Sequence, residues 1–224
     1  AANLALAIRG NVTGQLDLPV PAYIPRGFME NISDQETEIR MRMARHFAEA
    51  IPAYRKIFGR SLDNGERDPN SLIAQMDTII ISAGGTENGH ITGWMGISED
   101  PAYSHIEPVY PGPIYNDRER EQLEQEGVIG DLLGYYITED KVDKFGINSY
   151  ISKVNNRVLG PTPADLQHCA ERARKENLPG VIMAVDGVGK ARVAASAIQN
   201  RCVTELICDA ELAEELAKIK GIEI

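Results

Sequence analysis

The C-terminal third of the chain constrains the fold most, because two apolar runs there are each followed by a helical pattern. The first run, residues 181–185, meets a turn at residues 186–189, after which Lys190 opens a helix. The second run, residues 203–207, meets Asp209 and a further helix. Apolar runs of this length separated by helices are typical of parallel strands buried on both faces. We therefore expect an α/β fold with three layers, a mostly parallel sheet with helices on both faces.

The turn between the first run and its helix has the chemistry of an anion site. Gly187, Val188 and Gly189 would present backbone N–H groups at a helix N-terminus, which carries a partial positive charge. Lys190 opposes the helix dipole at that position, which an anion facing it would explain. The alternative is an ordinary turn with a solvated lysine, since Gly-x-Gly-Lys is not a complete phosphate-binding fingerprint.

The rest of the chain continues the alternation of strands and helices. We expect strands at residues 15–20, 77–82 and 128–137, the last one broken by glycines. We expect helices at residues 3–8, 34–50, 117–125 and 163–176, because capping residues precede the last three. Residues 60–70 predict a polar surface loop. Residues 84–115 predict a long irregular loop that is either a lid or specificity loop or an oligomer contact.

Four blocks, in order, resemble the sugar-binding domain of SorC-like bacterial transcription regulators, a group related to the DeoR-type repressors. Residues 127–136 (GVIGDLLGYY) resemble G-A-V-G-D-I-x-G-x-F-F, and residues 185–198 resemble V-A-G-G-x-x-K-x-x-A-I followed by a strand and a T-D-E helix start. Residues 156–160 (NRVLG) resemble N-x-R-V-x-G, and residues 18–23 (LPVPAY) resemble a strand ending in V-P-A-F.

This resemblance implies a fold like that of sugar-phosphate isomerases and deaminases. It implies one effector domain over residues 1–224, without the family's helix-turn-helix domain and first βα unit. In the family, a sugar phosphate is contacted by residues that correspond here to Asp131, Leu133 and Lys190. One departure is Asp186, which replaces a small residue beside the anion turn and would repel a phosphate unless it points outward.

The carboxyl ends of the strands, where open α/β sheets bind ligands, supply the candidate site. Residues 82–86 offer small side chains and hydroxyls, Asp131 offers a carboxylate, and the turn before Lys190 offers an anion site. As structural alternatives, residues 82–86 could be a plain turn, Asp131 could cap a backbone turn, and Lys190 could be solvated. The candidate ligand-binding residues are Ser82, Gly84, Gly85, Thr86, Gly130, Asp131, Leu133, Gly187, Val188, Gly189 and Lys190.

Composition narrows the class of protein. A net charge of −10 in 224 residues argues against a nucleic-acid surface on this chain. The resemblance implies that DNA is contacted through a separate helix-turn-helix domain. No apolar run spans a membrane and no signal peptide is visible. The three cysteines lack metal-site spacing and fit a reducing cytoplasm as core residues. His90 and His105 do not make a metal pair, and no cofactor is indicated.

The sequence therefore predicts a cytoplasmic, homo-oligomeric sensor domain for a sugar or sugar-phosphate effector, with no catalytic role. The alternative is an isomerase-like or deaminase-like enzyme, for which Asp131 is the one candidate general base.

Overall fold

A computed structural model describes residues 22–23, 39, 43, 46–48, 50–60, 66–87, 90–91, 117–142, 149–156 and 158–221. The strands are β1 Ala22–Tyr23, β2 Thr78–Ile81, β3 Ala83–Gly84, β4 Thr86–Glu87, β5 His90–Ile91, β6 Val128–Leu132, β7 Tyr135–Thr138, β8 Val158–Leu159, β9 Gly180–Val185 and β10 Glu205–Cys208. The helices are α3 Pro52–Phe58, α4 Leu72–Gln75, α5 Asp117–Gln125, α6 Tyr150–Asn155, α7 Pro163–Glu176, the 3-10 turn η2 Val188–Lys190, α8 Ala191–Gln199 and α9 Ala210–Lys220.

A parallel sheet of order β10-β9-β2 forms the centre of the fold, which confirms the predicted α/β class. The predicted strands at residues 77–82 and 181–185 are β2 and β9. The predicted strand at residues 203–207 is β10, displaced by one or two residues. The helices α7, α8 and α9 begin close to the predicted positions, and α7 carries the expected capping box between Thr162 and Asp165.

Helices cover one face of this parallel sheet in the described part of the chain. Ile79, Ile81, Val181, Met183 and Val185 are buried against α7, α8 and α9 in the main core. Right-handed crossovers explain the placement, because β2, β9 and β10 are added in one direction and their connecting helices then lie on the same side. The second helical layer that the sequence predicted is not seen among the described helices.

A second sheet, of order β3-β6-β7, is antiparallel. We predicted one strand over residues 128–137, and this was wrong, since the segment is the hairpin β6–β7. Leu133 and Gly134 form its two-residue turn with φ of 56° and 85°. Positive φ at both positions is the geometry of a tight hairpin turn. The Leu-Gly pair lacks the Asn-Gly signature of such turns, which is why the sequence pattern missed it.

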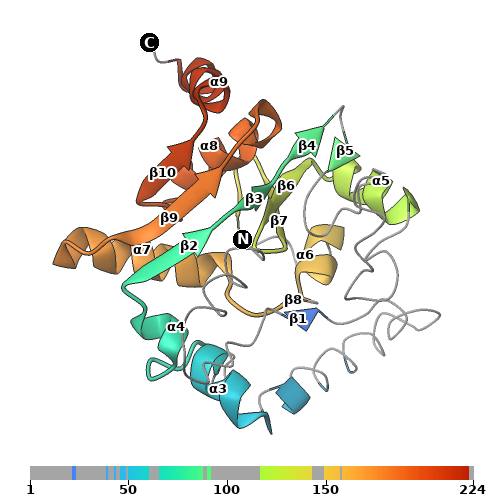
Figure 1. Cartoon of the computed structure of the whole chain (residues 1–224). Coiled ribbons are helices and arrows are strands. Elements are labelled where there is room, and N and C mark those ends of the chain that lie inside the picture. Colours follow the sequence, from blue (N-terminus) through green and yellow to red (C-terminus); the bar gives the residue numbers. More distant parts are fainter. Residues whose placement is uncertain are drawn as a thin grey trace, which may run out of the picture.

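The segment from β2 to β4 joins the two sheets. β2 pairs with β9 in the parallel sheet, and β3, one residue later, pairs with β6 in the antiparallel one. Figure 1 shows β2, β3 and β4 following one another across the molecule. The start of the predicted loop at residues 84–115 is therefore regular, because β4 pairs with β5. Its role as a lid or contact lies outside the described residues.

The N-terminal half differs from expectation at two places. The predicted helix at residues 34–50 is helical where it is described, at residues 39, 43, 46–48 and 50. A separate helix, α3, begins at Pro52 and was not predicted. Proline ends a preceding helix but also suits the first position of a new one, and here it does both. The predicted elements at residues 3–8 and 15–20 lie outside the described residues.

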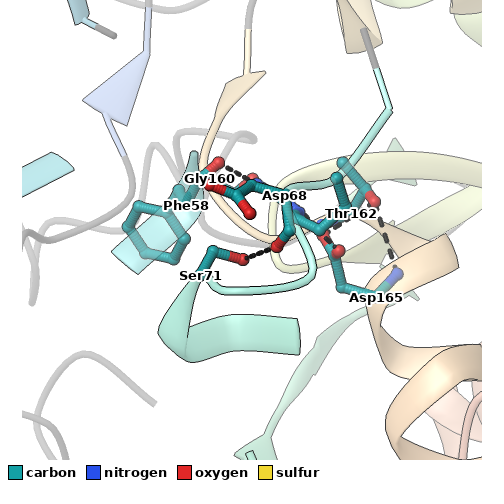
Figure 2. Close-up of polar contacts among 7 residues, drawn as sticks. Phe58, Asp68, Ser71, Gly160, Thr162 and Asp165 are labelled. Atoms are coloured by element: carbon teal, nitrogen blue, oxygen red, sulfur yellow. Dashed lines mark hydrogen bonds and ion pairs between the residues drawn. The ribbon is translucent and has the colours of Figure 1, made fainter. Parts of the chain in front are cut away.

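Residues 60–70, predicted as a surface loop, are anchored where they are described. The guanidinium of Arg67 forms an ion pair with Asp165, and its Nε donates to Asp165 Oδ1 at 2.7 Å. Arg67 also donates to the backbone carbonyls of Phe58 and Gly160. Figure 2 shows Asp165 and Thr162 at the start of α7 beside Phe58 and Gly160. This cluster of polar contacts ties the segment before α4 to the first turn of α7.

Two of the blocks that carry the family resemblance meet in space. β1 and β8, from residues 18–23 and 156–160, pair antiparallel with Ala22 opposite Leu159.

No described helix is long and apolar enough to cross a membrane. Cys169 and Cys202 are buried as predicted, and Cys208 is half-buried against the core.

Candidate functional site

The strand β3 brings together the predicted site residues from distant parts of the sequence. Ser82 is half-buried between β2 and β3, and Gly84 in β3 lies opposite Asp131 in β6. Thr86 follows in β4, which contacts η2. The carboxylate and the anion turn therefore lie on either side of the short segment 82–86, and Asp131 reaches it through the antiparallel pairing of β3 with β6.

Two glycines, Gly85 and Gly130, allow these backbones to touch. A Cβ on Gly85 would lie 2.2 Å from the carbonyl oxygen of Gly189 and 3.0 Å from the Cα of Lys190. A Cβ on Gly130 would lie 2.2 Å from the carbonyl oxygen of Gly84. Real Cβ atoms do not approach so closely, so a side chain at either position would push the segments apart. We call Gly84, Gly85, Gly130 and Gly189 the glycine junction.

Asp131 lies at the glycine junction with a buried carboxylate, its residue only 3% exposed. Its Oδ1 accepts a hydrogen bond from the backbone N–H of Gly134 at 2.8 Å. Its Oδ2 is buried and accepts no hydrogen bond from any described residue. Burial raises the pKa of Asp131 to about 6, and the Gly134 hydrogen bond partly opposes this. An ionised carboxylate with a bare oxygen is costly in a protein interior, which marks a place where a ligand donor could bind.

Leu133 stands apart from the other candidates. It occupies the first turn position after β6, and its half-buried side chain packs against the main core. The ligand contact expected from the resemblance would therefore come from the turn's backbone, whose Gly134 N–H already holds Asp131.

The anion turn has a charged partner in its own chain. Lys190 Nζ lies 3.0 Å from Asp186 Oδ1, and the side chain of Asp186 is 86% exposed. The position that departs from the family pattern thus points outward and pairs with the lysine. Asp186 partly neutralises Lys190, so a bound anion would have to share or displace it.

Asp209 is a residue whose role in this turn the sequence reading missed. It caps α9 by accepting from the Leu212 N–H at 2.7 Å, and its other oxygen accepts from the Gly187 N–H at 2.7 Å. These two hydrogen bonds, with the nearby charge of Lys190, hold the pKa of Asp209 below its usual value against slight desolvation. One N–H expected to face an anion is therefore used to brace the turn. The sequence indicates that Asp209 can cap α9, but it does not indicate the hydrogen bond to Gly187, 22 residues earlier.

A surface cavity of about 400 Å³ lies elsewhere, beside α3 and α4. Its lining residues are Ala50, Pro52, Arg55, Lys56, Asp68, Asn70 and Ser71. Arg55 and Lys56 give this cavity two positive charges, but none of the ligand-binding residues predicted from the sequence lines it. No group of three or more His, Cys, Asp or Glu residues in the described part of the chain could hold a metal ion.

Comparison with known proteins gives likeness in structure only. No family model matches the sequence, and no curated protein does. A domain of a possible sugar-binding transcriptional regulator from Arthrobacter aurescens TC1 is 18% identical, with a TM-score of 0.49 over 78% of this chain and 50% of that one. A DeoR family transcriptional regulator from Listeria monocytogenes is 18% identical, with a TM-score of 0.43 over 63% of this chain and 44% of that one.

The full-length sorbitol operon regulator SorC from Klebsiella pneumoniae is 14% identical, with a TM-score of 0.49 over 78% of this chain and 42% of that one. The chain thus spans about half the length of the solved structures that it matches.

Proposed function

We propose that this chain is the effector-binding domain of a sugar-responsive transcription regulator, and that the effector binds at the glycine junction between Asp131 and Lys190. The observation that carries the proposal is the buried Oδ2 of Asp131, which has no hydrogen-bond donor among the described residues. A sugar hydroxyl is a donor of the right kind. Binding would replace an unsatisfied acceptor with a charge-assisted hydrogen bond.

A phosphate group on the sugar is the finer part of the proposal, and it depends on Lys190. The lysine and the N–H groups of Val188 and Gly189 provide positive potential at the start of α8, whereas the Gly187 N–H is held by Asp209. The ion pair with Asp186 weakens that potential but lies at the surface, where such pairs contribute little. A phosphate could therefore compete for Lys190 at modest cost.

Sensing needs no bond to be broken. An effector that binds one arrangement of the domain more tightly shifts the population toward that arrangement, and a DNA-binding domain in the same regulator would read the shift. We place a regulator of this kind in the cytoplasm, where a sugar effector would reach it. DNA contact through another domain is consistent with the acidic charge of this chain.

The test is a thermal-shift screen against phosphorylated and unphosphorylated pentoses, hexoses and polyols. A ligand at about one hundred times its Kd adds about 2.7 kcal/mol of stability, which raises the Tm of a chain this size by roughly 5–10 °C. We expect a phosphorylated sugar to give this shift, Asp131→Asn and Lys190→Ala to abolish it, and the exposed control Lys218→Ala to retain it. A shift that survives both site variants would place the ligand elsewhere.

An isomerase-like or deaminase-like activity is the second candidate, because a carboxyl with a pKa of about 6 suits a general base. Incubation with each sugar phosphate in D2O distinguishes the two functions. A sensor leaves the C1 and C2 protons in place, whereas a general base that abstracts one of them introduces deuterium from the solvent.

A further inference from the structure

The anion turn carries more negative than positive charge in its own side chains. The ammonium of Lys190 lies 3.0 Å from the carboxylate of Asp186, and its charge also acts on the carboxylate of Asp209. Two carboxylates therefore stand against one lysine at this turn. A site that only had to attract phosphate would carry the opposite balance of charge, because its field would then draw the anion in. The second carboxylate needs an explanation.

Asp209 is explained by the backbone that it holds. Its two oxygens accept hydrogen bonds from the N–H groups of Gly187 and Leu212, both at 2.7 Å. One bond braces the anion turn and the other caps α9. Moving this carboxylate would break both bonds, so it stays in place when an anion binds.

Asp186 is held by the lysine alone. Within the described part of the chain, Lys190 is the only partner of its carboxylate. The side chain of Asp186 is 86% exposed, whereas that of Lys190 is 28% exposed. Turning Asp186 into the solvent breaks one surface ion pair and leaves no buried acceptor without a donor. Asp186 is therefore the group that an incoming anion displaces.

The donors that remain for this anion are few. Asp209 already occupies the N–H of Gly187, so the turn offers the ammonium of Lys190 and the N–H groups of Val188 and Gly189. A phosphate group carries nearly two negative charges, which Lys190 attracts and the carboxylates of the turn repel. At a solvent-exposed turn these opposing effects are similar in size, so phosphate by itself gains little.

We propose that Asp186 is a specificity-determining residue, which competes with the phosphate group of the effector for Lys190. The proposal rests on the proposed function, in which a sugar hydroxyl also donates to the buried Oδ2 of Asp131. Only a ligand that makes this second contact gains enough to displace Asp186. Inorganic phosphate lacks the sugar and does not hold the site. Asp186 thereby makes the response depend on the sugar and not on the phosphate alone.

Isothermal titration calorimetry on the whole chain tests the competition. The probes are inorganic phosphate and the phosphorylated and unphosphorylated forms of the sugar that gives the largest thermal shift. Asp186→Asn keeps the size of the side chain but removes its charge. We expect it to lower the Kd of both phosphate-containing probes about three- to tenfold and to leave the Kd of the unphosphorylated sugar unchanged.

Two control variants separate the charge of Asp186 from other effects. Asp186→Glu keeps the charge and should bind all three probes as the unmodified chain does. Glu215→Gln removes a carboxylate from another exposed pair, 3.1 Å from Lys218, and should also change no Kd. If Asp186→Glu tightens phosphate binding as much as Asp186→Asn does, a loosened turn causes the gain and the proposal is overturned.

The same titrations distinguish this proposal from the proposed function. If the sugars bind in a manner that Asp131→Asn abolishes, but Asp186→Asn leaves the preference for the phosphorylated form unchanged, the effector site stands and the role of Asp186 is wrong. If no sugar binds either the unmodified chain or Asp186→Asn, the proposed function is wrong and the role of Asp186 in specificity is lost with it.

Discussion

Replacing Asp131 by asparagine should stabilise the protein at alkaline pH while removing its response to the effector. Burial raises the pKa of this carboxyl from 3.8 to about 6, a difference of about two units. Each unit corresponds to about 1.4 kcal/mol, so the ionised side chain destabilises the folded state by about 3 kcal/mol above pH 6. Asparagine keeps an acceptor for the Gly134 N–H but never ionises.

The sign follows from the direction of the shift. A carboxyl whose pKa is raised on folding binds its proton more tightly in the folded state, so its relative stability is complete below pH 3.8 and is lost as pH rises through 6. About half of the penalty is already present at pH 5. The unmodified chain should therefore lose about 1–2 kcal/mol between pH 5 and pH 8 that Asp131→Asn does not lose.

Thermal unfolding followed by circular dichroism at pH 5 and pH 8 measures this difference, expected to be roughly 3–6 °C in Tm. Asp140→Asn, at an exposed position, should follow the unmodified chain at both pH values. If Asp131→Asn shows the same pH dependence as the unmodified chain, the carboxylate is not desolvated in the folded protein and the reasoning about its bare oxygen fails. A gain in stability coupled to a loss of binding is typical of a functional residue.

Further predictions concern the glycine junction, the ion pair that anchors α7, and the brace on the anion turn. Gly85→Ala should destabilise the fold by about 1–3 kcal/mol, because its Cβ would lie 2.2 Å from a backbone oxygen, whereas Ser82→Ala should be nearly neutral in urea unfolding. Arg67→Met should cost about 3–5 kcal/mol, since it leaves the buried Asp165 without its partner; an effect under 1 kcal/mol in the same assay would mean that the ion pair is dispensable. Burial raises the pKa of Asp165, but the hydrogen bonds and charge of Arg67 lower it by more, so the net pKa lies below 3.8. The stability that the ionised Asp165 contributes is therefore complete above pH 3.8 and should fade in acid titrations below it. Asp209→Ala should cost about 1 kcal/mol as a lost helix cap and should also weaken effector binding; calorimetry that finds unchanged affinity would show that the brace on the anion turn is not needed.

The elements whose sequence signals are local were predictable. The apolar runs that became β2 and β9, the Thr162 capping box of α7 and the Asp209 cap of α9 all depend on residues close together in sequence. The hairpin at Leu133–Gly134 was not predictable from its turn residues, since leucine at φ 56° is uncommon. The apolar residues on both sides of this turn have the pattern of one continuous strand, so the sequence does not reveal the hairpin.

The approach of residues 82–86 to the turn at residues 187–189 was predictable in outline, because β2 and β9 are parallel neighbours that end on the same side. Asp131 joins them through the antiparallel pairing of β3 with β6, which the sequence did not predict. What could not be predicted is how closely the segments approach, which depends on tertiary packing at Gly85 and Gly130. The pairing of Asp186 with Lys190 and the use of the Gly187 N–H by Asp209 were also beyond the sequence. They decide how strongly this turn could hold a phosphate.

The measurement that tests the central claim most directly is a ¹H–¹⁵N correlation titration with the sugar phosphate that gives the largest thermal shift. Binding at the glycine junction should move the amide signals of Gly84, Gly85, Gly134 and Gly187 together, with one dissociation constant. Movement confined to Arg55, Lys56 and Ser71, around the cavity beside α3 and α4, would contradict the account and place the effector there instead.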